Sequence, residues 1–136
     1  MTSPRSVVFA NLARTAIGTF GGSLKEIAAP NLGAAAIKAA IERAGLKPDE
    51  VGTVAMGNVI QAGAKMNPAR QAAVHGGLPV SVPAMTVNRV CGSCAQAIVS
   101  AAQEILLGSV GGRRRHGEHG SRALPHCART VGLSDR

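Results

Sequence analysis

The chain has 136 residues, enough for one domain with a hydrophobic core and too few for two. Hydrophobic residues make up 46% of the sequence and aromatic residues only 1%, so Ala, Val, Ile, Leu and Met must build the core. Half of the net charge of +8 lies in residues 111–136, which carry six Arg and two acidic residues. Because almost no aromatic side chains accompany these charges for base stacking, we expect no specific nucleic-acid binding.

The N-terminus and the cysteine count favour a cytoplasmic protein. The run "VVFA" that follows Arg5 is too short for a signal peptide or a membrane span. We interpret Val7 to Phe9 as a first β-strand and expect no membrane association. Three cysteines, an odd number, are typical of a reducing compartment rather than of a disulfide framework.

The clearest helical pattern lies in "NLGAAAIKAAIERAG". Asn31 is the expected N-cap after Pro30, and Gly45 stands where a left-handed residue ends a helix. Lys47-Pro48 prevents any continuation. One face of the expected helix collects its small and apolar residues, which are Leu32, Ala36, Ile37, Ala40, Ile41 and Ala44.

A strand and a short helix are expected next. The segment 51–60, "VGTVAMGNVI", predicts a strand that ends near Gly57-Asn58. Asn67 as N-cap, Pro68 at the first helical position and Gly76-Gly77 as the stop then predict a short helix.

The last regular elements are an extended segment and a long helix. Residues 79–90, "PVSVPAMTVNRV", are β-rich, and the helix is expected from Gly92 to Leu107 with Gly108 at its end. Because it is apolar or small on nearly every side, we expect this helix to be buried on most faces. Alternating strands and helices predict an α/β domain with at least partly parallel pairing.

Cys91 lies where the extended segment passes into this helix. The first-turn N–H groups and the helix dipole stabilise a thiolate there, and Gly92 allows a substrate carbonyl to come close. This placement suits covalent acyl transfer through a thioester. A buried, inert thiol is the alternative, and Cys91-x-x-Cys94 also fits a redox motif. A zinc site is disfavoured because its other ligands would have to come from the unusual tail: His116, His119, His126 and Cys127.

Three motifs, in order along residues 5–110, resemble the thiolase family. "RTAIGTFGGSLK" is similar to the family's "RTPIGxFGGxL", and "MGNVIQAGAKMNPARQAA" to "MGNVLQAGxGQNPARQAA". "NRVCGSCAQAI" resembles the nucleophile motif "NRVCGSG". Cys94 departs from it, since the family has Gly there. This second sulfur would either crowd the acyl pocket or, under oxidation, form a disulfide with Cys91. His75 matches no catalytic position.

The resemblance implies a fold, an activity and a role for Cys91. Thiolases consist of two similar α/β halves stacked as a layered sandwich, and this chain would hold an incomplete βαβαβα half. They catalyse reversible Claisen condensation and thiolysis of acetyl-CoA and 3-ketoacyl-CoA in lipid metabolism. The resemblance implies that Cys91 would hold the acyl thioester, while a His and a second Cys from later loops would transfer protons. No cofactor or metal is implied, acyl-CoA thioesters are the substrates, and the complete enzymes are homodimers or homotetramers.

The family pattern is expected to end at Val110. Residues 111–136 form a basic tail rich in Gly, Arg and His. With suitable synonymous codons, CGG CGG CAT GGA GAA CAT GGA for residues 114–120, reading one base later gives Gly-Gly-Met-Glu-Asn-Met, the family's continuation. We therefore interpret residues 1–110 as a partial thiolase N-terminal domain and residues 111–136 as out of frame and disordered. The chain would then be an inactive truncated acetyl-CoA acetyltransferase. The alternative is a non-catalytic redox or interaction fragment that uses Cys91-x-x-Cys94 and the basic tail.

Overall fold

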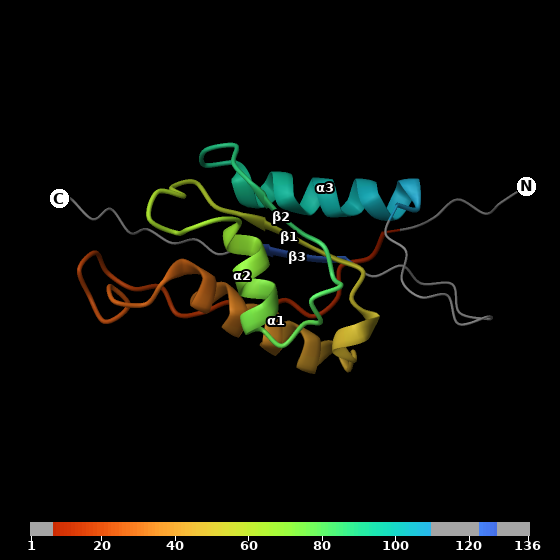
Figure 1. Ribbon diagram of the computed structural model, residues 1–136, viewed down its shortest axis with the longest axis horizontal. Coiled ribbons are helices and arrows are strands. Elements are labelled where there is room, and N and C mark those ends of the chain that lie inside the picture. Colours follow the sequence, from red (N-terminus) through yellow and green to blue (C-terminus); the bar gives the residue numbers. More distant parts are fainter. Residues whose placement is uncertain (1–6, 110–122, 128–136) are drawn as a thin grey trace, which may run out of the picture.

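The computed structural model describes residues 7–109 and 123–127 (Figure 1). Residues 7–27 contain neither a helix nor a strand. The regular elements are, in chain order, α1 (Ala29–Ala44), the short 3₁₀ helix η1 (Pro48–Glu50), β1 (Thr53–Gly57), α2 (Pro68–His75), β2 (Ala84–Val87), α3 (Ser93–Leu107) and β3 (Ala123–Cys127). The expected α/β class is therefore confirmed.

The three strands form one parallel sheet in the order β2-β1-β3. In β1, Ala55 pairs with Met85 of β2 on one side and with Pro125 of β3 on the other. Helix α3 packs on one face of the sheet, and α1 and α2 pack on the opposite face (Figure 1). All five residues of β1 are buried, as expected for a central strand that is covered on both faces.

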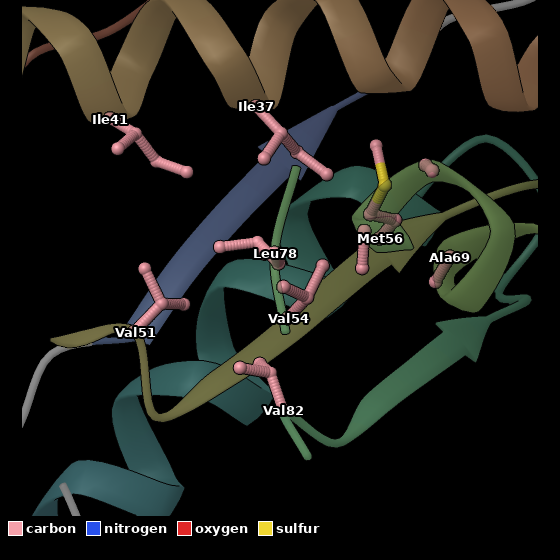
Figure 2. Packing of buried hydrophobic residues seen from close by; sticks show 10 residues of the cluster. Ile37, Ile41, Val51, Val54, Met56, Ala69, Leu78 and Val82 are labelled. Atoms are coloured by element: carbon pink, nitrogen blue, oxygen red, sulfur yellow. The ribbon is translucent and has the colours of Figure 1, made fainter. Parts of the chain in front are cut away.

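The larger core lies between the sheet and the helices α1 and α2. Figure 2 shows Ile37 and Ile41 pointing from α1 toward the side chain of Val54. Helices α1 and α2 approach closely because Gly33 has no side chain: a Cβ there would lie 2.9 Å from Met56 Cε and 3.0 Å from Ala72 Cβ. The cluster consists of Ile37, Ile41, Val51, Val54, Met56, Ala69, Ala72, Ala73, Leu78 and Val82. As composition predicts, it contains no aromatic residue.

The smaller core lies between the sheet and α3. Ala97 and Ala101, four residues apart on the helix, pack against Ala55 of β1. Only these two alanines and Ser93 are buried among the fifteen residues of α3. The prediction that α3 is buried on most faces is therefore wrong, because in the described structure its small residues face the sheet and larger ones such as Leu107 face outward.

Helix α3 is also apolar enough to be compared with a membrane span. The window Val90–Leu107 has a mean hydropathy of 1.4, and 17% of it is buried. One such helix is weak evidence, since core helices of soluble proteins meet the same criterion. The expected absence of membrane association stays a prediction.

Most of the predicted helix ends are confirmed. Gly45 and Gly108 adopt left-handed conformations at the ends of α1 and α3. Asn67 caps α2, where its side chain accepts a hydrogen bond of 3.1 Å from the backbone N–H of Arg70. The prediction for the start of α1 is wrong by one turn. The N-cap is Ala28, and Asn31 already lies inside the helix, donating its backbone N–H to Ala28 O at 2.9 Å.

Two further expectations differ from the structure. Val7 to Phe9 form no strand, and Val8 and Phe9 are mostly exposed, because no neighbouring strand pairs with this segment in the described structure. Disorder is wrong for Ala123–Cys127, which pair with β1 as strand β3. The other tail residues, 111–122 and 128–136, lie outside the described residues.

Candidate active site

The thiol of Cys91 lies at the junction between β2 and α3. Cys91 is exposed, and the next residue, Gly92, is the N-cap of α3. The cap makes no side-chain hydrogen bond, and the first turn of the helix contains no acidic residue. The positive end of the α3 dipole is therefore not neutralised by a carboxylate of its own turn, which favours an anion beside it. The strand-to-helix junction that the sequence predicts at Cys91 is therefore present.

The backbone just before the cysteine is in an unusual conformation. Val90 has a φ of +47°, in the left-handed region that β-branched residues rarely adopt. Such a conformation costs about 1–3 kcal/mol and persists only where neighbouring contacts impose it. The sharp reversal at Val90 carries the chain from β2 into α3 and leaves the following side chain, that of Cys91, exposed.

Polar side chains on both sides of Val90 bind its peptide groups. Asn88 Oδ1 accepts a hydrogen bond of 3.0 Å from the Val90 N–H. The Ser93 hydroxyl donates to Val90 O at 2.6 Å and accepts from the Arg89 N–H at 2.9 Å. Arg89 also donates from its guanidinium to Gln96 Oε1 at 2.8 Å, which ties the end of the loop to the second turn of α3.

The amino end of α3 lies directly against the end of β1. A Cβ at Gly57 would lie 2.6 Å from Cys94 N and 2.6 Å from the carbonyl carbon of Ser93. Only a glycine fits at such a distance from backbone atoms. The position of the helix end, and of Cys91 beside it, is thus set against the central strand.

The two cysteines of Cys91-x-x-Cys94 are in different chemical states. Cys91 is a free thiol, whereas Cys94 is engaged in a disulfide that does not involve Cys91. The disulfide between them, one of the two roles considered for Cys94, is therefore not formed in this structure, and the redox alternative gains no support from it.

The remaining candidates have no catalytic arrangement in the described structure. His75 ends α2, and its Nδ1 lies 3.0 Å from Asn31 Oδ1. His116 and His119 lie outside the described residues, and among the described residues no group of three His, Cys, Asp or Glu side chains is placed to hold a metal ion.

A shallow pocket lies at the amino ends of α1 and α2 and does not include Cys91 among its lining residues. It contains one polar side chain, that of Asn58, whose Nδ2 is buried without a hydrogen-bond partner. The other lining residues are apolar: Ala29, Pro30, Met56, Pro68, Ala69 and Ala72. The pocket offers no cluster of donors for a phosphate or a carboxylate.

A family model described as "Thiolase, N-terminal domain" matches residues 7–111. The chain belongs to the thiolase family. A Cupriavidus necator protein named acetyl-CoA acetyltransferase is 53% identical over 120 residues, covering 88% of this chain and 30% of that protein. A second protein of that organism, named beta-ketothiolase BktB, is 56% identical over 105 residues, covering 76% of this chain and 27% of its own length. A Xenopus tropicalis protein named acetyl-CoA acetyltransferase, mitochondrial, is 46% identical over 121 residues, which cover 89% of this chain and 29% of that protein.

The thiolase match has two further consequences. The chain spans about 30% of the length of the curated relatives it matches. An alignment of 120 residues cannot fit within residues 1–110, so the similarity to the Cupriavidus necator acetyltransferase continues past Val110. The family model ends at residue 111, next to the predicted end of the family pattern, and the reading frame of residues 111–136 stays a prediction.

The sequence predicted that Cys91 lies at a strand-to-helix junction, but it did not predict which side chains hold that junction. Val90 carries no sequence signal of a left-handed conformation, which usually coincides with Gly or Asn. Ser93 and Asn88 belong to the segment that resembles the nucleophile motif, but the resemblance implies no role for either. A hydroxyl two residues after the cysteine and an amide three residues before it, at a strand-to-helix turn, are the signals that could have identified them.

Proposed function

We propose that this chain is the N-terminal portion of a thiolase-type acyltransferase in which Cys91 carries the acyl group. The complete enzyme would catalyse reversible Claisen condensation and thiolysis of acetyl-CoA and 3-ketoacyl-CoA. One observation carries the proposal: in a thiolase N-terminal domain, Cys91 is a free, exposed thiol at the uncapped amino end of α3.

The proposed chemistry is an exchange of thioesters. The Cys91 sulfur, as a thiolate, attacks the carbonyl carbon of an acyl-CoA and forms a new C–S bond. The bond to the CoA sulfur breaks, and CoA leaves as a thiolate that takes up a proton. In the condensation direction, the acetyl group on Cys91 then passes to the carbanion of a second acetyl-CoA, and the free Cys91 thiolate is regenerated. The family resemblance assigns the proton transfers to a His and a second Cys from later loops.

The wider assignments rest on the same resemblance. We propose CoA thioesters as substrates without a further cofactor, a cytoplasmic location, and a homodimer or homotetramer for the complete enzyme. We also propose that residues 1–110 are family sequence and that residues 111–136 are read out of frame after a small deletion. Sequencing the encoding DNA across the Val110 codon tests the last point directly.

Acetylation of the chain tests the proposal. The purified protein is incubated with acetyl-CoA and digested, and the peptides that contain each cysteine are weighed by mass spectrometry. We expect an acetyl group on Cys91, none in a Cys91→Ala variant, and none on the chain unfolded in urea. A reversible disulfide between Cys91 and Cys94 without acetylation would instead support the redox alternative.

Alkylation provides a second, substrate-free test. Iodoacetamide reacts with thiolates, so at neutral pH Cys91 should be alkylated faster in the folded chain than in the same chain in urea. Equal rates in the two states would show that the junction does not activate the thiol.

A further inference from the structure

The left-handed conformation of Val90 requires an explanation within the structure. A valine with a φ of +47° returns to a negative φ unless its two peptide groups are held. Rotation at Val90 would turn the following peptide, and with it the Cα–Cβ bond of Cys91, away from the amino end of α3. Whatever holds Val90 therefore also decides where the thiol points.

Both peptide groups of Val90 are held by side chains. The N–H donates to Asn88 Oδ1 at 3.0 Å, and the carbonyl accepts from the Ser93 hydroxyl at 2.6 Å and from the Ser93 N–H at 3.1 Å. If Val90 returned to a negative φ, its N–H and its carbonyl would point in different directions. The bonds to Asn88 and to Ser93 could then not both form.

The two holding side chains are themselves anchored. Asn88 Nδ2 donates to Val59 O at 2.9 Å, which connects it to the loop after β1. Ser93 is only 2% exposed, and its hydroxyl also accepts from the Arg89 N–H at 2.9 Å. The hydroxyl thus uses its donor and an acceptor site at once, and it links the Asn88–Arg89 peptide to the carbonyl of Val90.

We propose that Asn88 and Ser93 are positioning residues that keep Val90 left-handed and thereby hold the Cys91 thiol at the amino end of α3. Each residue would act through the Val90 backbone, to which both are hydrogen-bonded. The proposal rests on the proposed function only in taking Cys91 as the nucleophile. The geometric claim about the thiol is independent of which acyl group it would carry.

The test measures alkylation of Cys91 by iodoacetamide in the complete 136-residue chain, by peptide mass spectrometry, at a neutral pH where circular dichroism shows each variant to be folded. Asn88→Ala and Ser93→Ala each remove a hydrogen bond that orders the turn, so each should slow alkylation about fivefold. Asn88→Asp retains the acceptor for the Val90 N–H and should restore most of the rate. Ser100→Ala is the matched control, because Ser100 lies on the same helix and its Oγ accepts only a long bond of 3.3 Å from Gln96 Nε2.

A rescue separates positioning from general stability. Glycine adopts a φ of +47° without strain, so Val90→Gly should reduce the loss caused by Ser93→Ala when the two changes are combined. A purely structural role of the hydroxyl predicts additive losses. If Ser93→Ala does not fold, the pair Asn88→Ala and Asn88→Asp decides the question, since Asn88 is exposed.

The outcomes distinguish this inference from the proposed function. Wild-type alkylation rates in folded Asn88→Ala and Ser93→Ala would overturn the positioning role, as would an equal loss in Ser100→Ala. Slower alkylation in both variants, with no acetylation of the wild-type chain by acetyl-CoA, would support the positioning role and overturn the proposed function alone.

Discussion

Replacing Gly57 by alanine should destabilise the chain by pushing α3 away from the sheet. The added Cβ would lie 2.6 Å from Cys94 N and from the Ser93 carbonyl carbon, where ordinary contact begins at 3.4 Å. The helix end must therefore move by about 0.8 Å, the difference between the two distances. Because backbone rather than a flexible side chain obstructs the methyl group, we expect the free energy of unfolding to fall by about 1–3 kcal/mol.

Gly33→Ala is the matched control. Its Cβ would also be crowded, at 2.9 Å from Met56 Cε, but that atom is the end of a flexible side chain that can turn aside. The other close atom, Ala72 Cβ at 3.0 Å, is about 0.4 Å inside ordinary contact, which is half of the shift that Gly57→Ala requires. Alanine in a helix interior also gains about 1 kcal/mol over glycine. Gly33→Ala should therefore cost less than Gly57→Ala.

Urea unfolding followed by far-ultraviolet circular dichroism measures both changes, since the chain has no Trp or Tyr for fluorescence. With a urea dependence of about 1–3 kcal/mol per molar, Gly57→Ala should lower the midpoint by roughly 1 M. The reasoning would be refuted by a Gly57→Ala chain as stable as the wild type, or by one that loses less than Gly33→Ala.

Three other predictions follow from the fold and the family. Asn67→Ala removes the cap from the Arg70 N–H and should lower the free energy of unfolding by about 1–2 kcal/mol, whereas Asn67→Asp, which keeps the acceptor oxygen, should lose less in the same urea assay. Ile37 is fully buried, so Ile37→Ala should cost about 2–5 kcal/mol and Ile37→Val about 0.5–1.5 kcal/mol; similar values for the two would contradict the described core. The purified 136-residue chain should show no acetoacetyl-CoA thiolysis, because residues that act as a catalytic unit fail together, and restoring the frame after Val110 with the downstream gene should restore both activity and solubility. Measurable CoA-dependent thiolysis by the chain as printed would overturn the last prediction.

The sequence predicted best those features that depend on neighbours within one turn. Asn67-Pro68 and the glycines that end α1 and α3 act through local backbone geometry, and they lie where they were expected. The predicted N-cap at Asn31 was wrong because proline is tolerated inside the first turn of a helix as well as before it. The helix therefore begins earlier, at Ala29.

Features that depend on distant partners were predicted less well. A β-rich run such as Val7 to Phe9 becomes a strand only beside another strand, and the described structure pairs β1 with Ala123–Cys127 instead. The position of Cys91 was predictable because it lies between a β-rich segment and a helical one. The side chains that fix the backbone beside it were not predictable. The left-handed Val90 arises from contacts of Asn88 and Ser93 that no periodicity encodes.

The absence of aromatic residues from the core determines how its packing can be observed. The chain has two phenylalanines, and both Phe9 and Phe20 lie in residues 7–27, largely exposed and outside every helix and strand. Aromatic near-ultraviolet signals would therefore report on this N-terminal segment and not on the layers around β1. The methyl groups of Ile37, Val54 and Met56 are the probes that sense those layers, so isotope labelling of methyl groups is the spectroscopy suited to following the packing of this domain.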